Sequence, residues 1–419
     1  MKDRSLLVGI DLGEKLTQMN CFDFTSYEPV PIGRQGENDR IYEIPTGLAV
    51  NPGKGIWYWL DEIYPEEDQI LEIRHLLPDV IREETVQIGS FSMDSYQLLK
   101  RFVVKVLSLL TEYYPQDRIK KLVISLAKKE DRIEEYLHRI VLEMELPENT
   151  LVVLNHRQSY MYYAISQPKE LWVNNVGLFE MEGGHLEYTQ INIDKKTVPV
   201  IIGATQKNLS NTMNWEELRK ESEEDIRYAF LNLAGTVLHK QYVTTLYVTG
   251  DGFESGWAAG ALKELCAGRR VFRGQNLFTR GACYAARELS GEGKLSDCLF
   301  LDEDMIARNV SVKLYHDAEI QEFLMAKAGA LWREVDCSVD VIPDEEDELQ
   351  ITIQNVLQHE TKAHMLSLSG FSGRENKMTR FTIRLRFADR NTCIVTLKDN
   401  GFGQFCPSSN RVWERHISI

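Results

Sequence analysis

Residues 6–13, near the N-terminus, read LLVGIDLG and carry the strongest fold signal in the sequence. Its apolar residues predict a buried strand, and the turn that follows predicts a hairpin whose second strand spans 18–23. Glycines after a strand, here Gly9 and Gly13, let the backbone approach a phosphate closely and offer N–H donors. A carboxylate at the strand end, here Asp11, can hold water around Mg²⁺.

The second half of the chain repeats this pattern. A strand over 176–180 reaches a turn at Gly183 and Gly184, and the chain returns as a strand over 186–193. Two hairpins that both carry glycines at the turn predict a duplicated α/β domain.

A later strand over 244–248 runs into Gly250 and Gly252. A glycine pair at this position leaves room for a flat purine ring. The order of strands and amphipathic helices between these motifs predicts a parallel or mixed sheet covered by helices. The expected helices begin at about Asp94 and span roughly 130–146, 160–165, 221–238, 257–266 and 276–288, and the further strands span 121–126 and 151–154.

After Ser290 the sequence changes character. A glycine-containing break at 291–294 is followed by short runs with alternating apolar residues, which predict an antiparallel sandwich. The acidic run Asp344–Glu348 is expected to be a solvated turn. The alternating runs span 310–315, 337–342, 349–356, 380–387 and 393–398.

Composition excludes several classes of protein. The chain has 419 residues, 43% of them hydrophobic, which is enough for two or three domains with large cores. Its net charge of −15 disfavours binding to nucleic acid or to anionic membranes, both of which need clustered cations. We therefore expect neither a nucleic-acid nor a membrane partner.

The seven cysteines are scattered and form no CxxC pair, which argues against a disulfide framework and a zinc site. The apolar stretch near the N-terminus is too short for a signal peptide, and no run is long enough to span a membrane. A reducing cytoplasm is the expected location.

Taken in order, these motifs resemble those of the actin-like ATPase superfamily, and most closely those of the DnaK-type heat-shock chaperones. The matching segments cover nearly the whole chain, except that it stops before any counterpart of the chaperones' helical lid. They are GIDLG at 9–13, Val123–Leu126 with Asn155, FEMEGGHLE at 179–187, LYVTGDG at 246–252, TRGACYAA at 279–286, the linker-like DCLFLD at 297–302, and the late strands of 381–403.

This resemblance implies a particular domain organisation. Residues 1–290 would form a nucleotide-binding-type domain of two ribonuclease-H-like halves, about 1–170 and 171–290. A linker at 291–303 would lead to an all-β sandwich at 304–419, similar to a substrate-binding domain. The stretch between Gly184 and Gly250 is too short for the subdomain that clamps adenine in the chaperones, and 205–220 looks like a bypass.

The resemblance also names candidate site residues. Asp11, Glu180 and Glu187 are the catalytic candidates, and Asp11 and Glu180 are the candidates for Mg²⁺. The candidates for ATP or ADP binding are Gly9, Asp11, Gly13, Gly183, Gly184, Gly250 and Gly252.

Departures from the family pattern concentrate at the phosphate loops. Glu14 and Lys15 replace two threonines, and Glu182 replaces a glycine. His156 stands roughly where the family has a glutamate, and its catalytic lysine has no clear counterpart. Added carboxylates beside a polyphosphate are unfavourable, by about 4 kcal/mol for two unit charges 4 Å apart at an effective dielectric of 20.

Several functions remain open at this point. The first is a chaperone-like binding or scaffolding protein with an eroded, inactive nucleotide site, which binds a protein or peptide partner through its β domain. The alternative is an active ATP-dependent chaperone-like ATPase with an altered site, and the third is a sugar kinase or filament-forming cousin. His156 and His185 could form an acid/base pair or be ordinary cleft residues, and Trp57, Tyr58 and Trp59 could form a partner surface or a packed strand edge.

Overall fold

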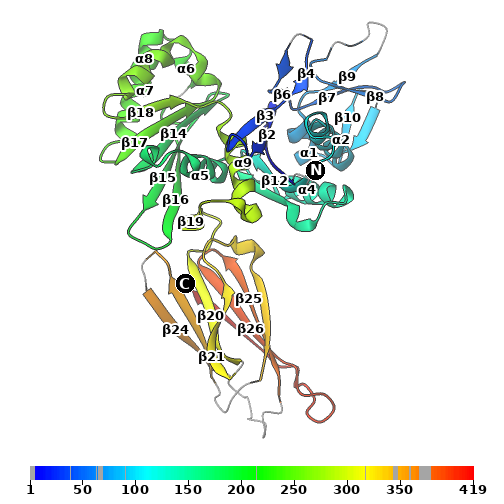
Figure 1. Cartoon of the computed structure of the whole chain (residues 1–419), viewed down its shortest axis with the longest axis vertical. Coiled ribbons are helices and arrows are strands. Elements are labelled where there is room, and N and C mark those ends of the chain that lie inside the picture. The colour runs from blue at the N-terminus through cyan, green and yellow to red at the C-terminus, as the bar shows by residue number, and fades with distance from the viewer. Residues whose placement is uncertain are drawn as a thin grey trace. The chain divides into compact units, whose positions relative to one another are not determined.

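The computed structural model describes residues 5–37, 39–62, 64, 69–89, 91–213, 215–316, 318–342, 348–357, 360–367 and 379–419. It is a mixed α/β structure with antiparallel sheets at its C-terminal end (Figure 1). The chain forms two compact units, residues 1–192 with 205–296, and residues 193–204 with 297–419. Of the predicted acidic turn, residues 344–347 lie outside the described part, and Glu348 begins a strand.

The first half of the N-terminal unit is built on a six-stranded sheet of order β13-β12-β1-β2-β3, with β6 paired to β2. β12 and β13 run parallel to β1, whereas β2 and β3 continue the sheet antiparallel. The predicted hairpin of residues 6–23 is therefore confirmed as β1 and β2. The strands are β1 (Ser5–Leu12), β2 (Leu16–Asp23), β3 (Glu28–Ile32), β6 (Ile44–Pro45), β12 (Arg118–Leu126) and β13 (Leu151–Asn155).

Smaller elements and helices cover this sheet. Helix α2 (Ser95–Ser108) begins at the N-cap Asp94, whose side chain accepts from the Gln97 N–H, and buries one apolar face. The helices are α1 (Leu76–Arg82), α2, α3 (Leu110–Tyr113), α4 (Asp131–Glu143) and α5 (His156–Ser166). The small strands are β4 (Arg34–Gln35), β5 (Arg40–Ile41), β7 (Leu48–Asn51), β8 (Ile56–Trp59), β9 (Leu71–Ile73), β10 (Thr85–Ile88) and β11 (Phe91–Asp94).

The second half repeats the arrangement of the first. Its sheet has the order β18-β17-β14-β15-β16-β19, in which β17 and β18 run parallel to β14 and β15 returns antiparallel. The strands of this half are β14 (Asn175–Glu182), β15 (His185–Asp194), β17 (Val243–Thr249) and β18 (Arg270–Arg273), and the helices are α6 (Trp215–Leu218), α7 (Glu223–Val237), α8 (Gly256–Leu265) and α9 (Leu277–Arg287). The sheet also includes β16 (Val200–Asn208) and β19 (Cys298–Leu301), of which residues 200–204 and 298–301 belong to the C-terminal unit.

Helices α5 and α9 lie between the two sheets of the N-terminal unit (Figure 1). Helix α9 packs on β1, where a Cβ on Gly9 would lie 2.2 Å from the backbone nitrogen of Cys283. Helix α5 reaches the other sheet, where the Tyr160 hydroxyl donates to the Gly177 carbonyl. The two helices cross closely, since a Cβ on Gly281 would lie 2.0 Å from the Ser159 carbonyl oxygen.

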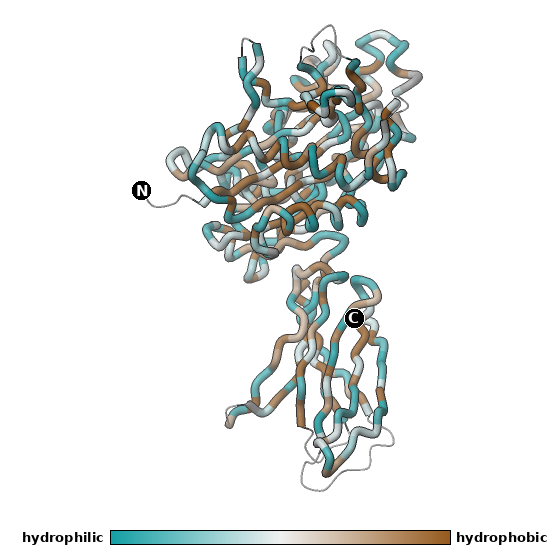
Figure 2. The backbone as a smooth tube through the Cα atoms, turned by 90° about the vertical axis from the view of Figure 1, so that its right-hand side faces the viewer, coloured by the Kyte–Doolittle hydropathy of each residue, from teal (hydrophilic) through white to brown (hydrophobic). Residues whose placement is uncertain are grey.

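The C-terminal unit contains two four-stranded antiparallel sheets of order β21-β20-β23-β24 and β22-β25-β26-β27. Their inner faces share one buried cluster that includes Val310, Ile351, Ile383 and Val395. Hydrophobic residues accordingly run along the strands (Figure 2). The strands are β20 (Arg308–His316), β21 (Glu319–Ala326), β22 (Asp336–Val341), β23 (Glu348–Asn355), β24 (Glu360–Ser367), β25 (Phe381–Asp389), β26 (Thr392–Asp399) and β27 (Val412–Ser418).

The segment expected to be a linker, 291–303, contains a strand. Cys298–Leu301 form β19, which pairs in parallel with Val200–Gly203 of β16. The four apolar residues of β19 are thus held in a sheet. Within the described residues, no helix has the length and apolar character needed to cross a membrane.

Candidate functional site

The central residue of the candidate site, His156, is placed by the end of a strand and the start of a helix. Strand β13 ends at Asn155, and α5 begins at His156. The Asn155 side chain accepts from the Gln158 N–H while the Gln158 side chain accepts from the Asn155 N–H, which forms a capping box. This cap fixes the backbone of the first turn of α5, which begins with His156.

The His156 ring lies between two carboxylates. Its Nε2 is 2.8 Å from Oδ1 of Asp11, and its Nδ1 is 3.5 Å from Oε1 of Glu180. The ring also stacks on Phe278 of α9, with the ring centroids 3.7 Å apart and the planes 9° from parallel. The imidazole is therefore held on its edge by two acceptors and on its face by an aromatic ring.

Charge on His156 is favoured by this setting. The side chains of His156, Asp11 and Glu180 are only 15%, 16% and 22% exposed. Burial by itself lowers the pKa of His156, but the charges and hydrogen bonds of Asp11 and Glu180 outweigh it and raise the pKa to about 10. His156 is thus an imidazolium at neutral pH, with one carboxylate at each nitrogen.

A third carboxylate stands beside this group. Glu187 of β15 is directly opposite Glu180 of β14 in the hairpin register. Its oxygen accepts a short hydrogen bond from Gln206, which also accepts from Arg157. Burial and the nearby Glu180 charge raise the pKa of Glu187 above its usual range, although the Gln206 bond opposes the shift.

The glycine turn of the second hairpin binds a carboxylate of the protein itself. Gly183 and Gly184 have φ of +56° and +84°, a left-handed conformation that favours glycine. The Gly183 N–H donates to Asp251, at 3.1 Å from its Oδ1. Lys15 joins the two hairpins, with its Nζ 3.2 Å from Glu182 and 3.4 Å from Asp251.

The remaining candidate glycines are required by packing. Gly9 admits α9 against β1, and the Gly13 N–H donates to the Leu16 carbonyl across the first hairpin turn. Gly250 has φ of +96°, and a Cβ there would lie 2.1 Å from the Met181 carbonyl oxygen. A Cβ on Gly252 would meet the Met181 side chain at 2.4 Å. The atoms that lie close to these glycines belong to Cys283, Leu16 and Met181.

The structure brings together the three candidate carboxylates Asp11, Glu180 and Glu187 around His156. The expected alternative of a His156–His185 pair is not formed, because the His156 nitrogens face Asp11 and Glu180, and His185 is exposed at the hairpin turn. Sequence reasoning did not assign Lys15, Phe278 or the bridging role of His156. Strand order could have predicted the contact between His156 and Asp11. Strands β13 and β1 both run parallel to β12, and the C-terminal ends of parallel strands lie at one edge of the sheet.

These residues can hold a proton firmly and keep the two halves of the N-terminal unit in contact. Asp11 belongs to the first half and Glu180 to the second, so the imidazolium is an ionic link between them. Within the described parts of the chain, no group of three or more His, Cys, Asp and Glu side chains is arranged to hold a metal ion.

Comparison with known protein families assigns the chain to a family. Residues 30–303 match the profile of the C-terminal region of a family of unknown function, DUF5716, and the chain belongs to this family. Residues 305–419 match a domain of unknown function, DUF8552. No curated protein matches the chain.

Proposed function

We propose that this protein is a chaperone-like binding or scaffolding protein with an actin/DnaK-type fold, whose nucleotide site is closed and inactive. The repeated topology of the N-terminal unit supports the fold. Each half has three parallel strands continued by an antiparallel hairpin, and the two helices α5 and α9 lie between the halves. A cytoplasmic location is part of the proposal, based on the scattered cysteines.

The observation that carries the proposal is the position of His156. In a working ATPase of this superfamily, the carboxylate after the first strand would face Mg²⁺ and phosphate. Here Asp11 and Glu180 are bonded to the His156 imidazolium. A buried cation that is part of the chain satisfies these carboxylates permanently, and this removes the need for a metal ion.

The phosphate loops favour the same conclusion. A phosphate bound at the second hairpin would need the Gly183 N–H, which already donates to Asp251. It would also meet the carboxylates of Glu180, Glu182 and Glu187. The residues present therefore do not fit Mg²⁺ with ATP or ADP, and we derive no hydrolytic step.

The C-terminal unit is the proposed binding arm. Strand β21 is an edge of its sheet, where main-chain groups can pair with an added strand. Tyr315 and Ile320 face each other across β20 and β21 and are 75% and 76% exposed, and Leu324 is 46% exposed. This edge suits an extended protein segment with apolar side chains.

Titration calorimetry with ATP and ADP, with and without Mg²⁺, tests the closed site. We expect no saturable heat at nucleotide concentrations up to about 1 mM, a limit that corresponds to binding weaker than about −4 kcal/mol. Binding at micromolar strength, with ATP hydrolysis that disappears in Asp11→Ala, would instead support the active chaperone-like ATPase.

The binding arm is tested separately with a set of immobilised extended peptides of apolar and acidic composition. We expect apolar peptides to bind and Ile320→Lys to weaken them, because the change puts a charge in the middle of the edge patch. Lys313→Gln on the neighbouring strand serves as the charge control. Equal binding of apolar peptides to Ile320→Lys and the parent protein would exclude this edge.

A further inference from the structure

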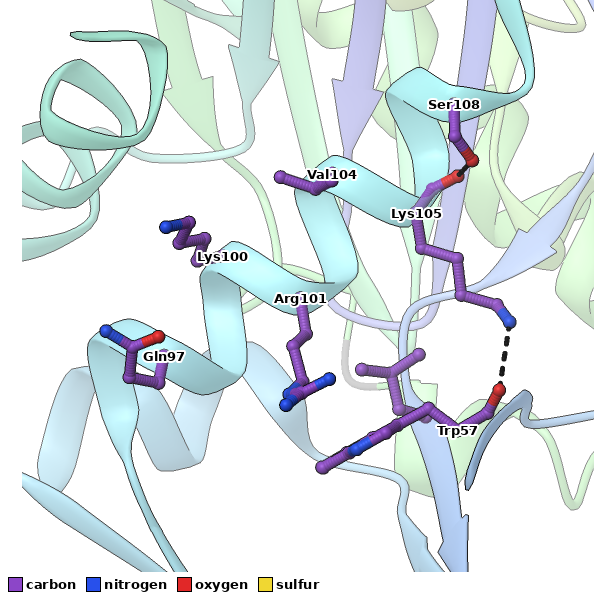
Figure 3. Close-up of a pocket in the computed structure, with 8 residues that line it drawn as sticks. Trp57, Gln97, Lys100, Arg101, Val104, Lys105 and Ser108 are labelled. Carbon is purple, nitrogen blue, oxygen red and sulfur yellow. Dashed lines mark hydrogen bonds between the residues drawn. The ribbon is translucent and has the colours of Figure 1, made fainter. Parts of the chain in front are cut away.

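A second candidate site lies on the outer side of the first half. The exposed face of α2 and strands β7 and β8 line a pocket of about 400 Å³. The helix supplies residues three and four apart, which share one face. The lining residues include Leu48, Trp57, Lys100, Arg101, Val104 and Lys105 (Figure 3).

Cations and an indole ring are combined in this pocket. The Arg101 guanidinium lies over the Trp57 ring, with its Cζ 4.8 Å from the ring centroid (Figure 3). Lys105 extends to the same strand, where its Nζ donates to the Trp57 carbonyl at 3.2 Å and lies 4.7 Å from the centroid of Trp59. Of the aromatic cluster singled out in the sequence, the half-buried Trp57 lines the pocket, whereas Trp59 is buried.

Two lysines of this face have acidic neighbours. Lys100 pairs with Glu143, and Glu62 is the acidic neighbour of Lys105. Among the residues that the structure describes, Arg101 has no carboxylate partner, and its guanidinium lies over the Trp57 ring. Arg101 and Lys105 are four residues apart on α2 and therefore lie on the same face of the helix.

This arrangement is unusual for a chain with a net charge of −15. Burial lowers the pKa of Lys105, the charge of Glu62 opposes this shift, and the charge of Arg34 adds to it. An anion held between Arg101 and Lys105 would accept hydrogen bonds from both side chains. Leu48, Val104 and the edge of Trp57 would remain available to an apolar body.

We propose that this pocket binds a small organic anion, whose carboxylate or phosphate contacts Arg101 and Lys105 and whose apolar body lies against Trp57, Leu48 and Val104. The site is independent of the His156 site and of the binding arm. Its ligand class follows from the pairing of a cationic rim with an apolar wall.

Phenyl phosphate and phenylacetate are suitable probes, measured by calorimetry and ligand-observed NMR on the full chain. Inorganic phosphate carries the charge without the apolar body, and 2-phenylethanol carries the ring without the charge. We expect one of the two organic anions to bind at least about tenfold more tightly than either of these, because both parts of the pocket must be used. The stronger of the two identifies the anionic group.

Arg101→Gln should weaken that binding by about tenfold or more, since it removes the guanidinium group that would donate to the anion. Lys263→Gln is the matched control, because it removes one positive charge from an exposed position on α8 in the other half of the unit. Unchanged thermal stability of Arg101→Gln shows that the exposed substitution leaves the fold intact. Lys263→Gln should change the affinity less than about twofold.

Three results would overturn the proposal. The first is equal affinity in Arg101→Gln and the parent protein. The second is absence of saturable binding by either organic anion at about 10 mM, a concentration that would reveal even a weak site. The third is tight binding of an acidic peptide while neither small anion binds, which would make the pocket a protein-docking site.

Discussion

Nε2 of His156 lies 2.8 Å from Oδ1 of Asp11, so the first residue of α5 is bonded directly to the carboxylate at the end of β1. On its other side the same ring reaches Glu180 of the second half. An ionic group of three side chains therefore joins the two halves at the edge where their central strands end. The following predictions test what this group and its surroundings contribute.

Removing the cation should destabilise the N-terminal unit. In His156→Gln the carboxylates of Asp11 and Glu180 lose their charged partner while mostly buried, at a cost of about 2–4 kcal/mol. Chemical denaturation at pH 7 measures the loss. The double variant Asp11→Asn, His156→Gln should recover part of it, because one unpaired charge is then removed. Additive losses in the double variant would show that the two residues do not interact.

The stability of the protein should fall as the pH rises above neutrality. Folding raises the pKa of His156 from 6.5 to about 10, so the charged form stabilises the native state. That contribution is fully present below about pH 6.5 and is lost as the pH rises toward 10. Unfolding free energies measured between pH 6.5 and 9 should decline in the parent protein and decline less in His156→Gln. Parallel pH profiles would mean that His156 is neutral in the native state.

A carboxylate at position 156 should create a cation site. In His156→Glu three carboxylates would meet where His156, Asp11 and Glu180 now meet, and their repulsion should lower the melting temperature in the absence of divalent ions. Mg²⁺ or Ca²⁺ should then raise it, since both ions favour carboxylate oxygens. His156→Gln and the parent protein should show no such shift. A response to Mg²⁺ in the parent protein would contradict the closed site.

The exposed ion pairs of Lys15 should contribute little to the free energy of unfolding. Lys15 is 64% exposed, and its partners Glu182 and Asp251 are about half exposed. Their hydrogen bonds raise the pKa of Lys15, with Glu182 the main cause, but solvent screens such pairs. Lys15→Gln should cost less than about 1 kcal/mol, and high salt should erase the difference. A loss as large as that of His156→Gln would give Lys15 a structural role that its exposure does not suggest.

Gly9 of the first motif should not tolerate a side chain, because α9 packs directly on it. Gly9→Ala would place a methyl group 2.2 Å from the Cys283 nitrogen and should cost about 3 kcal/mol or more, since α9 must move away from β1. Gly235→Ala is the matched control, because nothing lies within 4 Å of its added Cβ in the exposed part of α7. It should be neutral or stabilise by up to about 1 kcal/mol. Thermal melts of the two variants separate these outcomes.

The sequence predicted the central strands and longer helices of the N-terminal unit because their patterns are strong, but it missed shorter elements such as α1, β16 and β18. The apolar run of β1, the amphipathic face of α2 and the capped start of α7 are local signals that tertiary packing did not override. In the C-terminal unit, β21, β24 and β27 were missed. Each is an edge strand with mostly exposed side chains, so its sequence lacks the alternation that marks an inner strand.

The duplicated α/β architecture could be predicted from the sequence, because buried strands, helix caps and glycine turns have local sequence patterns. Three contacts became visible only in the folded chain: His156 joins Asp11 and Glu180, the Gly183 N–H donates to Asp251, and Arg101 lies over Trp57. These contacts join residues far apart in the chain. Side-chain charge and spacing do not specify such partners until sheets and helices bring their ends together.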